Sequence, residues 1–93
     1  MPKVIAKIEV EDTAKWEKGF RTHGALFRSQ TIKKPIHYAE TAKNEILICF
    51  EPENIDAYLK GMDSSETEEA MKFDGVKRDT VQIFVLDKEF DPS

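Results

Sequence analysis

Alternating apolar and polar residues along the chain predict four β-strands. The four runs span residues 4–10, 36–41, 45–51 and 80–86. In the first run every second residue from Val4 to Val10 is apolar, whereas Lys7 and Glu9 face the other way. Asn44 separates the second and third runs, and because Asn tolerates a left-handed backbone it predicts a tight hairpin there.

A helix is predicted between the first two strands. Asp12 or Thr13 can cap it, because a short side-chain oxygen accepts a backbone N–H that the helix leaves unpaired. The helical spacing of apolar residues continues to residue 28 or 29, so we expect one helix over this span. Gly19 and Gly24 lie inside it, either to allow close packing or, at Gly24, to kink the helix.

A second helical region, in two parts, is predicted between the third and fourth strands. The first part begins at residue 53 or 54, runs to about residue 59 and is closed by Gly61. The second part begins at the capping-box pair Ser65 and Glu68 and ends near Phe73, where Gly75 stops it.

The resulting order, βαββαβ, predicts an α+β ferredoxin-like plait, in which a four-stranded antiparallel sheet carries both helical regions on one face. The third strand is apolar on both sides, because Ile46 and Ile48 alternate with Leu47 and Cys49. Strands of this kind are buried on both faces. One chain has too few helices to cover two faces, so we expect a homodimer that packs sheet on sheet.

Composition and charge narrow the class of protein. The 93 residues predict one domain over 1–93, with its core over 4–87 and a polar tail over 88–93. The formal net charge of −4 argues against nucleic-acid binding, which needs a basic surface. The single cysteine, Cys49, fits a reducing compartment. Neither an apolar run of the ~20 residues of a membrane span nor a signal-peptide pattern is evident, so we expect a cytoplasmic protein without membrane contact.

The most informative pattern is a stripe at i, i+4, i+7 and i+11 on one helix face, formed by Trp16, Phe20, His23 and Phe27. The three aromatic rings favour burial, and the imidazole of His23 can exchange a proton near neutral pH. Two interpretations stay open at this point. His23 is either a core histidine with paired nitrogens or the acid–base group of a pocket.

This helix and the third strand carry a resemblance to a known family. Residues 16–23, and residues 46–55 across the strand and the start of the next helix, resemble the dimeric α/β-barrel superfamily, in particular its small bacterial members of unknown function. The pattern extends over about residues 4–87. The resemblance implies a ligand between sheet and helices. Relatives include cofactor-independent monooxygenases, haem-degrading oxygenases, isomerases and stress-induced proteins, but the Asn–Trp–His set of the haem-degrading type is not evident here.

The candidate site residues follow from the stripe and from the resemblance. His23 is the candidate catalytic residue, and the candidate ligand-binding residues are Trp16, Phe20, Phe27, His37, Tyr38 and Arg28. The resemblance implies that the stripe forms the helix side of the cavity and that His37 or Tyr38 supplies its floor. Arg28, near the helix end, could reach an anionic substrate. Two histidines without a Cys/His cluster do not make a metal site, so we expect neither a metal nor a cofactor.

The preferred function is binding of a small aromatic or cyclic molecule, with acid–base or cofactor-independent oxygenase or isomerase chemistry. Two alternatives remain. The first is a non-catalytic structural or stress-related dimer with a filled core. The second is a tautomerase in which removal of Met1 exposes the secondary amine of Pro2 as a base.

Overall fold

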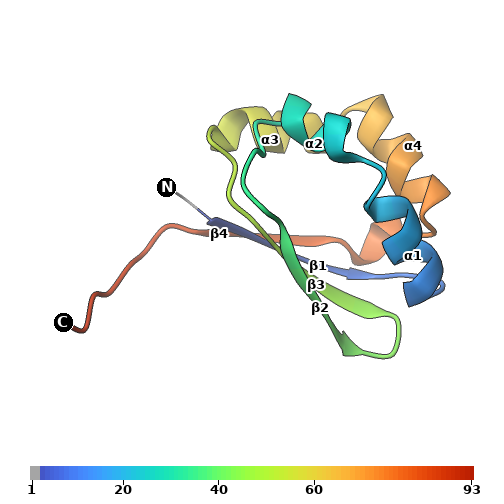
Figure 1. Ribbon diagram of the computed structural model, residues 1–93, viewed down its shortest axis with the longest axis horizontal. Helices are drawn as coiled ribbons and strands as arrows, with labels where there is room; N and C mark the ends of the chain where they lie inside the picture. Colours follow the sequence, from blue (N-terminus) through green and yellow to red (C-terminus); the bar gives the residue numbers. More distant parts are fainter. Residues whose placement is uncertain (1–2) are drawn as a thin grey trace.

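The computed structural model describes residues 3–93 and consists of one antiparallel sheet with helices packed on one face (Figure 1). In chain order the elements are β1 (Lys3–Glu9), α1 (Thr13–Phe20), α2 (Gly24–Ser29), β2 (His37–Ala42), β3 (Glu45–Phe50), α3 (Ile55–Met62), α4 (Ser65–Phe73), η1 (Arg78–Thr80) and β4 (Gln82–Leu86). The strands lie in the order β2-β3-β1-β4. This is the ferredoxin-like α+β plait, so the predicted fold class is confirmed.

The strands lie where the alternation predicts them, with small shifts at their ends. Asn44 has a φ of 61° in the β2–β3 hairpin, which confirms the predicted turn. β4 begins at Gln82 because the preceding residues form the short helix η1. There the hydroxyl of Thr80 accepts the backbone N–H of Glu9 at 3.0 Å and ties η1 to the end of β1. Beyond β4 the tail extends away from the body of the molecule (Figure 1).

The core lies between the helices and one face of the sheet. The buried side chains that fill it come from alternate positions of β1 and β3 and from α1 and α3, and include Val4, Ala6, Ile8, Ile46, Ile48, Phe50, Trp16 and Tyr58. Burial of each large apolar side chain contributes about 1.5–3 kcal/mol. The inward faces of β1 and β3 together are therefore the surface on which the helices pack.

The first helical region differs from the single helix that the sequence predicts. The chain turns at residues 21–23, so that α1 and α2 are separate helices. Asp12 caps α1 as expected, because its carboxylate accepts two backbone N–H groups of the first turn. The hydroxyl of Thr22 donates to the carbonyl of Gly19 at 2.6 Å and helps to end α1. The break falls just before Gly24, the residue at which a kink was expected.

Two boundaries in the second helical region were predicted wrongly. Gly61 lies inside α3 and does not close it; its small size instead makes room for Gln30, since a Cβ at Gly61 would lie 2.7 Å from Cγ of Gln30. Ser64, one residue before Ser65, caps α4 by accepting a backbone N–H. Gly75 ends α4 in the left-handed region with a φ of 76°, as predicted.

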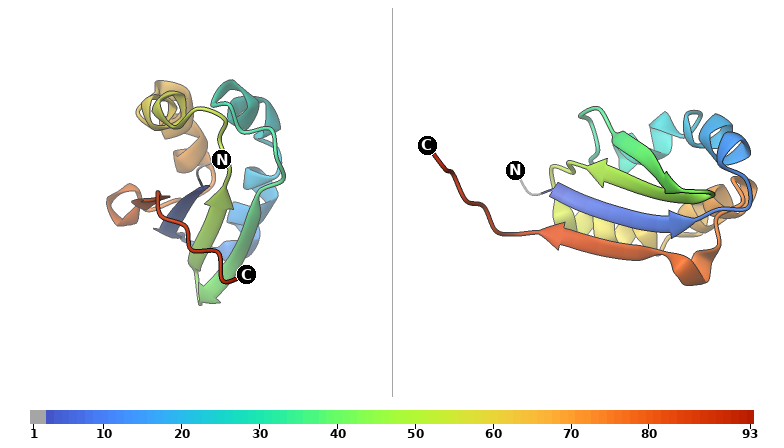
Figure 2. Two further views of the ribbon diagram at one scale, coloured as in Figure 1. Left: turned by 90° about the vertical axis from the view of Figure 1, so that its left-hand side faces the viewer. Right: turned by 90° about the horizontal axis from the view of Figure 1, so that it is seen from below.

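Within residues 3–93, no helix covers the second face of the sheet. The view from below in Figure 2 shows the four strands in front of the helices. The antiparallel register aligns His37, Cys49, Ile5 and Phe84 in one row across this face. Phe84 is 49% exposed, and Leu47 in the neighbouring row is 37% exposed. The open face is therefore mixed: apolar side chains such as Phe84 and Leu47 lie beside charged ones such as Lys7, and one chain leaves this face uncovered. None of the helices in this part of the chain is long and apolar enough to cross a membrane.

Gly75→Ala should lower the free energy of unfolding by about 1–2 kcal/mol, because a residue with a Cβ is strained in the left-handed region. The added Cβ would also lie 3.1 Å from the Glu11 carboxylate. Urea unfolding followed by circular dichroism measures the change. Gly24→Ala is the control, since a Cβ there meets only the mobile end of Arg28, at 3.2 Å. An equal loss in both variants would contradict the role of the backbone conformation.

Candidate functional site

A cavity of about 60 Å³ lies between the helices and the sheet. All four residues of the predicted stripe line it, with Trp16 and Phe20 on α1, His23 at the junction and Phe27 on α2. Although α1 and α2 are separate helices, the four residues of the stripe therefore all face the cavity. Strands β1 and β3 form the floor through their inward-facing residues, including Ile48.

A continuous series of aromatic rings runs along the cavity. The centroid distances are 4.6 Å for Trp16–Phe20, 4.9 Å for Phe20–Phe27, 6.0 Å for Phe27–Phe50 and 5.6 Å for Phe50–Tyr58. Distances in this range are typical of favourable aromatic pairs. The series connects α1 to α3 through β3 and gives the cavity an apolar wall suited to a flat or cyclic molecule.

His23 forms a close pair with Asp74, the residue that caps the end of α4. Its Nε2 lies 3.0 Å from Oδ2 and 3.2 Å from Oδ1 of the carboxylate. The side chain of His23 is 19% exposed and that of Asp74 only 4%. Because a carboxylate accepts hydrogen bonds, this contact assigns the Nε2 proton to His23 and leaves Nδ1 as the basic nitrogen of the neutral ring.

The carboxylate of Asp74 is held in the protein interior at a cost. Burial raises the pKa of Asp74 above its usual value, while the hydrogen bond and the charge of His23 act in the opposite direction. The carboxylate also lies against the backbone of α1, since a Cβ on Gly19 would overlap Oδ1. The glycine is therefore required where the carboxylate approaches the helix, and close packing explains its presence better than flexibility.

A second polar group on the cavity wall comes from Gln30 and Thr67, both buried. Nε2 of Gln30 donates to Oγ1 of Thr67 at 2.7 Å, and this hydroxyl donates to the carbonyl of Gly61 at 2.7 Å. Tyr58 lines the cavity as well and is 1% exposed. The lining residues thus combine an aromatic series with a few fixed polar side chains, and the surface that faces the void is almost entirely apolar.

Sequence reasoning missed several residues of this cavity. Asp74 follows an acidic helix, and nothing in its spacing separates it from the solvated carboxylates of that helix, such as Glu68 and Glu69. Its one signal is its place next to Gly75, at the end of the helix. Tyr58 does carry a signal, because it shares a helical face with Ile55 and with Met62, and this periodicity predicts an inward side chain.

Three predicted ligand-binding residues lie outside the cavity lining. His37 is on the open face of the sheet, because it pairs with Cys49, whereas its neighbour Tyr38 pairs with the inward-facing Ile48. The hydroxyl of Tyr38 donates to Oε2 of Glu17 at 2.7 Å, and its ring packs edge-on against the stripe from outside. This hydrogen bond, followed by burial, raises the pKa of Tyr38. The third, Arg28, is exposed on α2. The structure therefore brings the stripe together but not these three.

Two further expectations concern other chemistries. Pro2, the residue of the tautomerase alternative, lies outside the described residues. Within residues 3–93, no group of three or more His, Cys, Asp or Glu side chains is arranged to hold a metal ion.

Solved structures of similar shape come from small bacterial proteins. A Bordetella bronchiseptica protein named as a candidate antibiotic biosynthesis monooxygenase has a TM-score of 0.72 and 20% identity, over 96% of this chain and 97% of its own. SnoaB of Streptomyces nogalater, a cofactor-independent oxygenase, has a TM-score of 0.70 and 12% identity, over 98% and 95%. A Bacillus halodurans protein of the ethyl tert-butyl ether D family has a TM-score of 0.57 and 19% identity, over 96% and 99%.

No family model and no curated protein sequence matches the chain. At 12–20% identity the structural similarity establishes the fold and not the reaction. The similarity covers nearly all of this chain and nearly all of each similar chain, so it concerns the whole domain and not a shared fragment. The chain therefore has the ferredoxin-like α/β fold of the antibiotic biosynthesis monooxygenase structures, as its resemblance to the dimeric α/β-barrel superfamily implied.

Proposed function

We propose that this protein binds a small aromatic or cyclic molecule between its helices and its sheet, and that His23 exchanges a proton with it. The observation that carries the proposal is the His23–Asp74 pair on the wall of an aromatic cavity. The oxygenase name of SnoaB, which shares the fold, supports cofactor-independent oxygenation as the first reaction class to test.

The chemistry of the pair follows from its geometry. Asp74 accepts the Nε2 proton of His23, so that Nδ1 can take a proton from an acidic O–H or C–H group of the ligand. The resulting imidazolium is stabilised by the buried carboxylate at 3.0 Å. The anion left on the ligand is the electron-rich species that isomerisation, or attack on dioxygen, requires. His23 is thus the proposed acid–base residue, and Asp74 orients it.

The size of the cavity limits the ligand or requires motion. A cavity of about 150 Å³ holds benzene, and 60 Å³ is well below that value. Two flexible methionines, Met62 and Met71, line the cavity and can adapt to a ligand. The six-residue helix α2 has no fully buried residue, and it presents the partly buried Phe27 to the cavity. We therefore expect a ligand to enter by moving α2, together with Phe27 and the two methionines.

The small volume also favours the second candidate, a structural or stress-related dimer that binds nothing. A core filled by side chains needs no ligand, and 60 Å³ is a modest void for one domain. The two candidates differ in whether the cavity accepts any small molecule. The buried carboxylate favours binding, because a core built for stability alone has no need of it.

A homodimer completes the proposal. The open face of the sheet carries the half-exposed apolar residues Leu47, Phe84 and Leu86, and sheet-on-sheet packing would bury them. The same strands form the cavity floor with their other face, so dimerisation would also fix the floor.

His23→Ala should reduce turnover by about 100-fold or more while the fold persists, because general acid–base catalysis contributes about 10²–10⁴-fold. Oxygen uptake and product formation are measured over a panel of phenols, hydroquinones and cyclic ketones, without added flavin or metal. His37→Ala is the matched control, since this histidine lies on the opposite face of the sheet. Unchanged turnover in His23→Ala would remove His23 from the mechanism.

Asp74→Asn should change the pH dependence of stability. Because burial raises the pKa of Asp74 in the folded state, its carboxyl group loses its proton at a higher pH in the folded wild type than in the unfolded chain. The stabilising contribution of the protonated Asp74 side chain is complete below the usual Asp pKa, and it is lost as the pH rises through the raised pKa of the folded state. Urea unfolding between pH 3 and 5.5 should show the variant gaining stability relative to the wild type as the pH rises. A relative loss would mean that pairing with His23 outweighs burial.

Phe84→Glu should convert the dimer into a monomer, because it replaces a half-exposed apolar side chain of the open face with a charge that would lose its hydration in a sheet-on-sheet contact. Native mass spectrometry of freshly purified protein gives the oligomeric state and any bound mass in one measurement. Phe73→Glu is the control, since Phe73 is 69% exposed but lies on α4, away from the open face. A monomeric wild type would contradict the sheet-on-sheet dimer.

A further inference from the structure

We propose that the Tyr58 hydroxyl donates a hydrogen bond to an oxygen atom of the bound molecule. This inference rests on the proposed function and makes it more specific. It predicts a preference for ligands that carry a carbonyl or other accepting oxygen over hydrocarbons of the same shape. The ligand class is then a cyclic ketone, quinone or phenol, held by its oxygen at α3.

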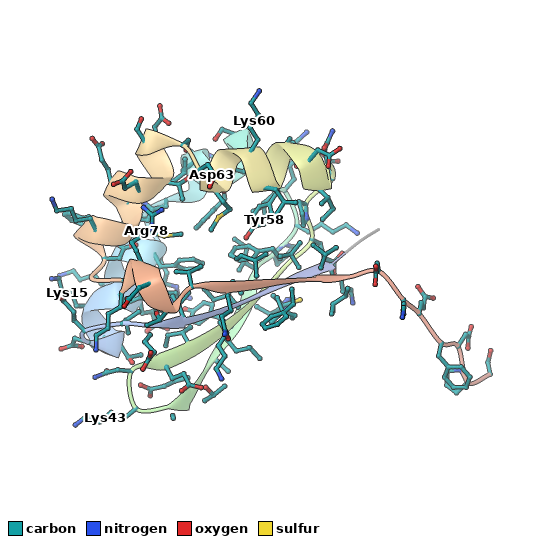
Figure 3. All side chains as sticks on the ribbon, turned by 180° about the vertical axis from the view of Figure 1, so that it is seen from behind. Lys15, Lys43, Tyr58, Lys60, Asp63 and Arg78 are labelled. Atoms are coloured by element: carbon teal, nitrogen blue, oxygen red, sulfur yellow. The ribbon has the colours of Figure 1, made fainter. Side chains whose placement is uncertain are left out.

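The first observation is an unpartnered donor inside the protein. Tyr58 is 1% exposed, lines the cavity, and its hydroxyl has no hydrogen-bond partner among residues 3–93. Figure 3 shows the side chain descending from α3 into the space between the helices and the sheet. Buried hydroxyls are nearly always paired, because an unpaired one loses its hydrogen bonds to water and gains nothing in return.

The neighbouring polar groups of the cavity do not share this feature. The single hydroxyl proton of Thr67 goes to the carbonyl of Gly61, and Gln30 donates to Thr67. The second tyrosine of the chain, Tyr38, donates to Glu17. The hydroxyl of Tyr58 therefore stands apart among the buried side-chain groups of the described residues in lacking a partner.

The hydroxyl is suited to donate and not to act as a base. Burial strongly raises the pKa of Tyr58, so the group keeps its proton throughout the range in which the protein is studied. Its ring is held in place by Phe50, with the ring centroids 5.6 Å apart. A fixed, protonated hydroxyl beside an apolar wall selects for an acceptor and gives the ligand one orientation.

Tyr58 and the His23–Asp74 pair come from different parts of the helical layer. Figure 1 places α3 over the start of β1, whereas the end of α4, which carries Asp74, lies towards the end of β1. A ligand whose oxygen is held by Tyr58 would therefore present another part of its ring to His23. For a ketone, the hydrogen bond would also stabilise the negative charge that develops on the oxygen when His23 removes a proton from a ring carbon.

The test uses a matched pair of probes, cyclohexanone and methylenecyclohexane, which differ in a carbonyl oxygen against a methylene group. Affinities are measured by titration of the ¹⁵N-labelled protein, followed by its amide NMR shifts. We expect the wild type to bind the ketone about five- to tenfold more tightly than the alkene, since one hydrogen bond is at stake. Tyr58→Phe should reduce this preference to less than about twofold.

Thermal unfolding without a probe gives a second, independent readout. Tyr58→Phe should keep or raise the melting temperature, because it removes an unpartnered buried hydroxyl. Tyr38→Phe is the matched control; it loses the hydrogen bond to Glu17, so it should melt lower and keep the ketone preference. In addition, the ¹³C-carbonyl resonance of bound labelled cyclohexanone should lie further downfield in the wild type than in Tyr58→Phe.

The outcomes separate the two proposals. If the wild type binds both probes equally, or if Tyr58→Phe keeps the ketone preference, the role of Tyr58 is overturned and the cavity remains a binding site. If neither probe, nor any compound of the wider panel, binds the wild type, the proposed function itself is overturned. A lower melting temperature in Tyr58→Phe with unchanged preference would show a purely structural hydroxyl and also overturn the inference.

Discussion

One buried carboxylate constrains how α1, α2 and α4 meet. Asp74 ends α4, lies against Gly19 of α1, and meets His23 at the junction of α1 and α2. A buried charge without a partner costs several kcal/mol, so the three helices are held in positions where the carboxylate and the imidazole meet. The break in the first helical region satisfies this requirement, because it places His23 at a turn beside the end of α4.

The two faces of the sheet serve different contacts, because a ligand would lie against one face and a second chain against the other. Along β3, Ile48 faces the cavity while its neighbours Leu47 and Cys49 face the open side. In a β-strand these positions alternate strictly, so packing on one face constrains the side chains of the other. If a second chain covers the open face, the floor of the cavity becomes part of a sheet buried on both sides. Dimerisation and the shape of the cavity would then be coupled through the same backbone.

The sequence predicts most of the fold but only half of the candidate site. The alternation from Val4 to Val10 and the turn at Asn44 are local signals, and local signals determine the strands. The stripe from Trp16 to Phe27 also predicts the helix side of the cavity, because helical periodicity survives the break. Asp74 reaches His23 across 51 residues of chain, and no local pattern records such a contact. To assign His37 and Tyr38 to a face of the sheet one needs the strand register, which the sequence does not specify at the edge of a sheet.

The costly features of this protein gather around one cavity. A carboxylate is buried at Asp74, a hydroxyl is unpartnered at Tyr58, and glycines at 19 and 61 give up helix propensity to let side chains approach. Departures from regular geometry outside this cavity are fewer: Thr31 has a φ of 67°, and the β2–β3 register shifts between Glu40 and Ala42. When departures from local stability concentrate in one place, a functional role explains them better than chance does. A structural dimer alone would require the open face of the sheet, but it would not require this arrangement on the other side.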